Sequence, residues 1–255
     1  MKPYRCIIAY DGTEYCGWQE QAHDRTIAGT LQKTFFAVFK KDIKVVGASR
    51  TDAGVHALGQ HARFYTDLNI DPSIMRSAWN AALPKSISII SLEESPIGFH
   101  PQHNVLSKTY WYHIFYQEPL PFYARYGTWL GKKLDQEALI KALMLMEGTH
   151  DFRPLSSDLP HDICTIRTVN SCTIEKEETI KALRIVIQGK SFVRYMVRRM
   201  VGAAIHCEQK KCPLEYIQKV LKNSIIDNYL PVAPAQGLIL KNITYAPLPD
   251  KGDLV

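Results

Sequence analysis

Apolar and polar positions follow two periodicities along the first hundred residues. Period-two alternation and flanking turn residues predict strands over residues 4–10, 43–48, 60–66 and 87–90, with a loop over 49–58. Helical spacing predicts a helix from the N-cap residue Thr26 to Lys41, and Asp71 followed by Pro72 starts a second helix that ends at Ala82. The order strand, helix, strand, strand, helix, strand is typical of an α+β sandwich with helices on one sheet face.

A second, similar series of elements follows Pro101. The pattern predicts strands over residues 109–116, 165–174, 183–187 and 238–245. It predicts helices over residues 135–147, 192–206 and 213–222. We therefore expect two α+β domains, comprising residues 1–105 and 106–255.

The composition indicates a folded, soluble protein. Of its 255 residues, 46% are hydrophobic and 22% are charged, and no apolar run reaches the roughly 18 residues that cross a membrane. The N-terminal apolar segment ends at Asp11, too early for a secretory signal. Six cysteines without a paired motif favour reduced thiols, so we expect a cytoplasmic protein.

The net charge of +6 favours a polyanionic partner without requiring one. Eight Lys and Arg residues between Lys181 and Lys211 are opposed there only by Glu208, which makes this stretch a candidate phosphate-binding surface. Cys207 with Cys212, and His100 with His103, could each begin a zinc site, but neither has the second pair of ligands. We therefore expect no metal.

The loop from Gly47 to Ala57 is the first candidate for chemistry. Two glycines and the turn-favouring run Ser-Arg-Thr-Asp predict a short rigid loop that presents Arg50 and Asp52. Side chains two apart on an extended segment point the same way, so an ion pair with Arg50 could hold Asp52 ionised. An oriented carboxylate is a usable nucleophile or base. The alternative is a structural turn with a surface ion pair.

Two further stretches carry candidate RNA contacts. Tyr110, Tyr112 and Ile114 share one strand face, where an aromatic ring could stack on a base or simply belong to the core. Arg194 and Arg198 lie one turn apart on the predicted helix. They could clamp a phosphate, pair with a carboxylate or remain solvated.

Five motifs occur in an order that resembles the bacterial tRNA pseudouridine synthase A family. They are Tyr10-Asp11-Gly12-Thr13 with Gly17-Trp18-Gln19, Ser49 to Ala57, Lys108 to Tyr112, Phe192 to Arg198, and Ala233 to Leu238. The block R-T-D-A-G-V-H-A is the most specific of them. The match spans almost the whole chain.

The resemblance implies two ferredoxin-like (RRM-like) domains with a central catalytic cleft, and a homodimer that binds tRNA. The implied reaction isomerises uridine to pseudouridine at positions 38, 39 and 40 of the anticodon stem-loop, with no cofactor or metal. Asp52 aligns with the essential aspartate and Arg198 with its basic partner. Tyr110 aligns with the tyrosine that packs on the uracil, and Arg50 with an arginine that helps displace the base. Arg194 and Leu238 are expected to contact the substrate.

The chain departs from the family pattern at a few positions. Gln102 stands where an arginine near a Phe-His pair is usual, Arg194-Tyr195 replaces a His-His pair or similar, and Arg199 replaces an asparagine. We expect these changes to affect RNA binding and the choice of position more than catalysis.

The reaction breaks the N1–C1′ bond, turns the uracil and joins C5 to C1′. The target must first leave its stack, at a cost of a few kcal/mol. Asp52 could then attack C1′ or promote loss of the 2′ proton. Two alternatives remain open at this stage: a non-catalytic tRNA-binding chaperone, and a metal-dependent RNA hydrolase that uses His56, His61 and Asp52.

Overall fold

The computed structural model describes residues 1–247 apart from residues 97, 158, 161 and 223–228, and these residues divide between two compact units. Unit 1 runs from Met1 to Leu106 and takes in the end of the chain from Leu240 on, whereas unit 2 runs from Ser107 to Ile239. The last strand, which the sequence analysis assigned to the second domain, therefore lies mostly in unit 1.

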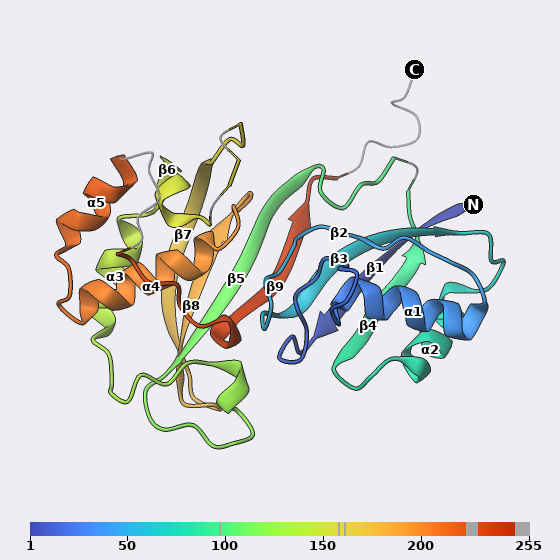
Figure 1. Ribbon diagram of the computed structural model, residues 1–255, viewed down its shortest axis with the longest axis horizontal. Coiled ribbons are helices and arrows are strands. Elements are labelled where there is room, and N and C mark those ends of the chain that lie inside the picture. Colours follow the sequence, from blue (N-terminus) through green and yellow to red (C-terminus); the bar gives the residue numbers. More distant parts are fainter. Residues whose placement is uncertain (97, 158, 161, 223–228, 248–255) are drawn as a thin grey trace. The chain divides into compact units, whose positions relative to one another are not determined.

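Unit 1 contains a mostly antiparallel sheet with two helices on one face (Figure 1). Its elements are β1 (Lys2–Tyr10), α1 (Ile27–Phe39), β2 (Val46–Gly47), β3 (His56–Thr66), α2 (Pro72–Ala82), β4 (Ile87–Glu94) and most of β9 (Leu238–Tyr245). Strand β1 pairs antiparallel with both β3 and β4, β2 pairs antiparallel with β3, and β9 is the other neighbour of β3.

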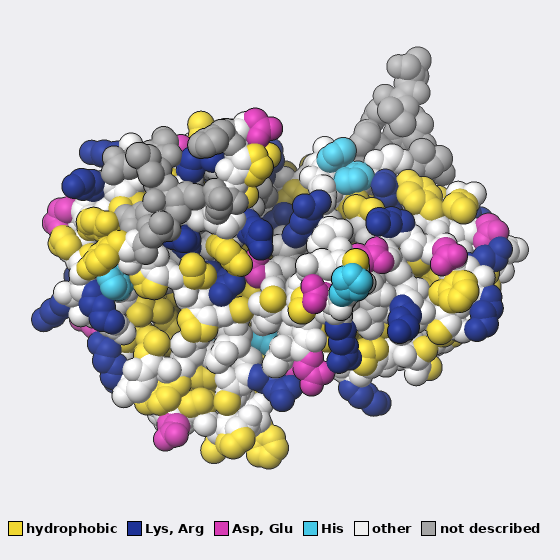
Figure 2. All heavy atoms as spheres, in the orientation of Figure 1, with side chains coloured by type: hydrophobic (Ala, Val, Ile, Leu, Met, Phe, Trp, Pro, Cys, Tyr) yellow, Lys and Arg dark blue, Asp and Glu magenta, His cyan; other side chains and the backbone are white. Residues whose placement is uncertain are grey.

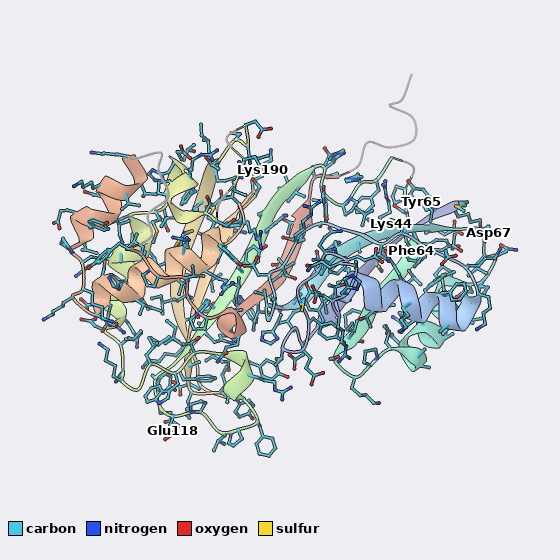
Figure 3. The ribbon with its side chains drawn as sticks, in the orientation of Figure 1. Lys44, Phe64, Tyr65, Asp67, Glu118 and Lys190 are labelled. Atoms are coloured by element: carbon cyan, nitrogen blue, oxygen red, sulfur yellow. The ribbon has the colours of Figure 1, made fainter. Side chains whose placement is uncertain are left out.

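Aromatic side chains fill the core of unit 1 between the helices and the sheet. The Phe35 ring of α1 lies 4.8 Å from that of Trp79 in α2 and 5.5 Å from that of Phe64 in β3. Phe64 is fully buried while the next residue, Tyr65, is exposed, as strand alternation requires (Figure 3). The expected helix starts are confirmed, because Thr26 caps α1 and Asp71 caps α2 through their side-chain oxygens.

Unit 2 contains an antiparallel sheet in the order β5-β8-β7-β6, together with three helices (Figure 1). Its elements are β5 (Val105–Phe115), α3 (Gln136–Met144), β6 (Gly148–Asp151), β7 (Ile166–Glu177), β8 (Ala182–Gly189), α4 (Met196–Glu208) and α5 (Leu214–Lys222). Short 3₁₀ turns lie at Ala124–Tyr126, Arg153–Leu155 and Ala235–Gly237. The α+β class expected from the sequence is confirmed.

Several element boundaries differ from the expectations. The strand expected over 43–48 is only Val46–Gly47, and β3 begins at His56, inside the expected loop. The helix expected from Phe192 begins at Met196, because Tyr195 adopts a left-handed conformation with φ of 65°. Strand β6 was not expected. No helix among the described residues is long and apolar enough to span a membrane.

Candidate active site

Asp52 lies in the loop that joins β2 to β3 in unit 1. The loop turns where the Val55 amide donates to the carbonyl of Asp52 at 3.2 Å, and Gly54 takes a positive φ of 77° there. Asp52 is partly exposed, whereas its neighbour Thr51 and the preceding Ser49 are buried. The loop therefore combines buried residues, which anchor it, with a partly exposed carboxylate.

The first half of this loop is held by the side-chain amide of Gln60 on β3. Gln60 is fully buried; its Nε2 donates to the carbonyl of Ser49 at 2.6 Å, and its Oε1 accepts from the Ser49 amide at 3.2 Å. One residue earlier, the Ala48 amide donates to the carbonyl of His61 at 2.8 Å. The backbone of β3 thus pairs with Ala48, and the Gln60 side chain pairs in the same way with the next residue, Ser49.

A second anchor reaches the residue next to Asp52. The hydroxyl of Tyr10, at the end of β1, lies 2.8 Å from the Thr51 hydroxyl, and Nε2 of Gln60 donates to the same Tyr10 oxygen at 3.5 Å. These three side chains are all buried. Asp52 therefore directly follows a segment in which Ser49 is held by β3 and Thr51 is contacted from β1.

The first motif of the chain packs directly against the Asp52 loop. The Trp18 amide donates to the carbonyl of Thr51 at 3.1 Å, and a Cβ on Gly17, whose φ is 90°, would lie 2.6 Å from that oxygen. A Cβ on Gly12 would overlap the carbonyl oxygen of Val55. Both glycines are needed because backbone from another segment occupies the space of a side chain.

Arg50 is exposed in this loop, and Asp52 is partly exposed. A bend at residues 48 and 49 and a turn at residues 53 and 54 flank the segment that carries both side chains. The ion pair between Arg50 and Asp52 stays a prediction.

Tyr110 is a buried residue of β5 in unit 2. It stands opposite Ile187 of β8, and its ring meets that of Phe192 edge-on, with the centroids 5.2 Å apart. The expected strand face is confirmed, because Tyr112 and Ile114 are buried too. Two residues before Tyr110, burial and the nearby Arg167 lower the pKa of Lys108 to about 8.

Arg194 and Arg198 do not lie one turn apart on a helix, since Arg194 precedes α4. The carbonyl of Arg194 accepts from the Ser157 amide at 3.1 Å. Both guanidinium carbons nevertheless lie 5.1 Å from the centre of the Tyr195 ring. The left-handed Tyr195, one of the departures from the family pattern, therefore brings the two arginines to one aromatic ring.

The motif from Ala233 to Leu238 is fastened to the same region of unit 2. Arg198 Nε donates to the carbonyl of Ala233 at 2.8 Å, and the Ala233 amide donates back to the carbonyl of Arg198 at 3.1 Å. The Tyr112 hydroxyl donates to the carbonyl of Pro234 at 2.9 Å. Leu238 follows as a buried first residue of β9. Three motifs that are distant in sequence thus converge.

The basic stretch is less uniformly basic in the structure than in the sequence. Lys181 pairs with Glu178 at 3.2 Å, and Arg184 pairs with Glu177. Lys190 is exposed at the end of β8 (Figure 3). On the face drawn in Figure 2, Lys and Arg side chains are spread over both units among acidic and apolar ones. The expected single basic surface is therefore partly neutralised by acidic residues.

The other two departures also make structural contacts. Gln102 Nε2 donates to the carbonyl of Gly47 at 3.0 Å, and Arg199 Nη1 donates to the carbonyl of Leu230 at 3.5 Å. Gln102 thereby supports the strand that leads into the Asp52 loop.

The histidines of the hydrolase alternative have separate structural contacts. The Gly12 amide donates to Nδ1 of His56 at 3.1 Å, and the ring of His61 lies 5.2 Å from that of Tyr245. Burial, with the nearby Arg5, lowers the pKa of His61 to about 4. Over the described ranges, His, Cys, Asp and Glu side chains form no group of three that could hold a metal ion.

Sequence reasoning missed Gln60, whose side chain holds the Asp52 loop. A signal for Gln60 existed, since a polar amide follows Gly59 in the predicted strand. Tyr195 was noted as a departure from the family pattern, but its left-handed backbone was not expected, because aromatic residues seldom adopt that conformation.

In unit 1, a partly exposed carboxylate on an anchored loop could act as a nucleophile or base. In unit 2, two arginines beside the partly exposed Tyr195 ring suit a phosphate-bearing ligand. The sequence profile of the tRNA pseudouridine synthases matches residues 6–104 and 142–246. The chain is 36% identical over 254 residues to tRNA pseudouridine synthase A of Thermodesulfovibrio yellowstonii, which covers 96% of this chain and 100% of that protein.

Two further relatives carry the same family name. Identity is 34% over 246 residues with tRNA pseudouridine synthase A of Clostridium botulinum strain Eklund 17B, and 33% over 247 residues with tRNA pseudouridine synthase A 2 of Bacillus cereus strain ZK. Both matches cover 96% of this chain and 100% of the relative. The chain belongs to the tRNA pseudouridine synthase family, a family of isomerases.

Proposed function

We propose that this protein isomerises uridine to pseudouridine at positions 38, 39 and 40 in the anticodon stem-loop of tRNA. The observation that carries the proposal is the Asp52 loop: Gln60 holds the backbone of Ser49 and Tyr10 contacts the side-chain hydroxyl of Thr51, while Asp52 is partly exposed. A nucleophile or base whose backbone is fixed before the substrate arrives loses little entropy in reaching its reactive position.

We assign the roles of the individual residues from the family resemblance. Asp52 attacks C1′ or promotes loss of the 2′ proton, and Arg198 supplies its basic partner. Tyr110 packs on the uracil, Arg50 helps to displace it, and Arg194 and Leu238 contact the substrate. Breaking N1–C1′ and joining C5 to C1′ rearranges one nucleotide, so the chemistry requires neither an external group donor nor a cofactor.

The proposal extends to architecture and assembly. The order β1-α1-β2-β3-α2-β4 in unit 1 supports a ferredoxin-like domain. We infer a second such domain, a catalytic cleft, a homodimer and a cytoplasmic location from the resemblance. The modest net charge of +6 supports the dimer, because two copies double the positive charge available to one tRNA. Sedimentation of a fully active monomer at micromolar concentration would contradict the dimer.

The reaction is tested with tRNA that carries tritium at C5 of uridine. Replacing the C5 hydrogen releases tritium into water, so the wild-type protein should release it in the presence of a chelator. Asp52→Asn should leave tRNA binding nearly intact and abolish release, because an amide cannot act as a carboxylate nucleophile or base. The matched control is Asp67→Asn, which changes an exposed carboxylate of unit 1 that pairs with Lys41.

Each alternative predicts a different result. A chaperone binds tRNA without tritium release, and a metal-dependent hydrolase cleaves the RNA and stops when chelator is added. Residual turnover above a few per cent in Asp52→Asn would refute the assignment of Asp52.

A further inference from the structure

Two cysteines in unit 2 lie next to each other and have no part in the proposed reaction. The Sγ atoms of Cys207 and Cys212 are 2.8 Å apart. A disulfide bond is about 2.05 Å long, so these are two reduced thiols in direct contact.

The backbone at the end of α4 brings the two thiols together. Cys207 lies one residue before the end of the helix, and the Lys210 amide donates to the carbonyl of Cys207 at 2.9 Å. Lys210 then adopts a left-handed conformation with φ of 57°, which reverses the chain. This reversal of the chain places Cys212 beside Cys207 at the end of α4.

The two thiols differ in accessibility. Cys207 is partly exposed, whereas Cys212 is buried. Both line a cavity of about 840 Å³ between the start of α3, the end of α4 and the start of α5. Its lining carries both signs of charge, and Lys132 pairs there with Glu208 and Lys141 with Glu137. A small disulfide can therefore reach the Cys207 sulfur, while the more buried Cys212 lies in contact with Cys207.

We propose that Cys207 and Cys212 form a redox-active dithiol that a small disulfide, such as glutathione disulfide, oxidises to an intramolecular disulfide. The Cys207 thiolate attacks one oxidant sulfur, the oxidant S–S bond breaks, and one thiol leaves. The Cys212 thiolate then attacks Cys207 in this mixed disulfide and expels the second thiol. Two protein thiols are oxidised, one disulfide is reduced to two thiols, and these take up the two protons.

The surroundings of the pair make its first step slow. Burial, the hydrogen bond with Cys212 and the nearby Glu215 carboxylate raise the pKa of Cys207 to about 12. Few molecules carry the attacking thiolate at neutral pH. The second step involves sulfurs already in contact, so the mixed disulfide should not accumulate.

The experiment uses the full chain, reduced, freed of reductant and treated with glutathione disulfide. Wild-type protein should lose two of its six free thiols, and peptide mapping should join Cys207 to Cys212. Cys212→Ser should stop at a glutathione adduct on Cys207, and Cys207→Ser should form no intramolecular bond. Cys16→Ser and Cys164→Ser are matched controls, since both residues are exposed and neither should affect the Cys207–Cys212 bond.

Three results would overturn the proposal. They are a stable glutathione adduct on Cys207 in the wild type, a disulfide that joins Cys207 or Cys212 to another cysteine, and retention of the Cys207 and Cys212 thiols under conditions that modify Cys16. The inference does not depend on the proposed reaction, because it is read from thiols and masses rather than from tritium release.

Discussion

Replacement of Gln60 by leucine tests whether the Asp52 loop is held from β3. Leucine has a similar size but cannot bond to the backbone of Ser49 or to the Tyr10 hydroxyl, so two buried hydrogen bonds to Ser49 and a longer one to Tyr10 are lost. Each is worth about 0.5–1.5 kcal/mol, and removing one partner of a buried bond costs more than this net value. We therefore expect Gln60→Leu to lower the free energy of unfolding by about 2–4 kcal/mol.

Urea unfolding measures this change, with Gln102→Leu as the control. Gln102 makes the same kind of bond, from its Nε2 to the carbonyl of Gly47 at 3.0 Å, but its side chain is exposed. Its loss should cost less than about 1 kcal/mol, because water replaces the missing partner. In the tritium assay kcat should fall for Gln60→Leu, with KM for tRNA little changed, since the loop positions Asp52 rather than the RNA. Equal destabilisation by both substitutions would refute the reasoning.

Three further predictions concern unit 2. Arg198→Ala should reduce turnover in the tritium assay about tenfold or more, which corresponds to the loss of one charge-assisted hydrogen bond of about 1.5–3 kcal/mol. Arg194→Ala, at an exposed position, should reduce turnover less in the same assay. Tyr110→Phe should keep much of the RNA affinity and lose activity. Tyr110→Leu should also lose RNA affinity, by up to about 1–3 kcal/mol of stacking free energy in a filter-binding titration. A fully active Tyr110→Phe would limit the role of the residue to stacking. The pKa of Lys108 lies at about 8, below its ordinary 10.5, so the charged form opposes folding below pH 8 and this penalty disappears as the pH rises to 10.5. Lys108→Met should therefore raise the free energy of unfolding by about 1–3 kcal/mol at pH 7 and leave it unchanged near pH 10.5; an equal gain at both pH values would contradict the assignment.

Local chemistry was enough to predict most helices of the fold and the order of elements in unit 1. Thr26 and Asp71 cap their helices with side-chain oxygens, an interaction that involves only neighbouring residues. The strand expected over 43–48 failed for a different reason. Ile43 and Val45 are buried and Lys44 between them is exposed, yet only Val46–Gly47 pairs with β3. Alternation of apolar and polar residues indicates which side chains are buried, but it does not indicate whether the backbone pairs with a neighbouring strand.

The start of α4 could not be predicted because its cause is tertiary. The apolar spacing from Phe192 onward suits a helix, but Tyr195 has a positive φ that costs an aromatic residue free energy. One contact from elsewhere in unit 2 supports the neighbouring backbone, because the Ser157 amide donates to the carbonyl of Arg194. The guanidinium groups of the nearby Arg194 and Arg198 flank the Tyr195 ring. The sequence around Tyr195 does not indicate the contact with Ser157.

The same limit applies to the candidate active site, where a motif mixes residues that bear chemistry with residues that make room. Asp52 and Gly17 both belong to family motifs; the sequence analysis singled out Asp52 for its carboxylate and assigned no role to Gly17. In the structure Gly17 has a positive φ, and the carbonyl of Thr51 occupies the place of a Cβ, so a side chain there would displace the residue next to Asp52. Gln60 lies outside every motif that carried the resemblance, yet its amide fixes Ser49 as directly as Gly17 accommodates Thr51. Membership of a motif is therefore a poor guide to which residues position the carboxylate, and hydrogen bonds to the loop backbone are the better guide.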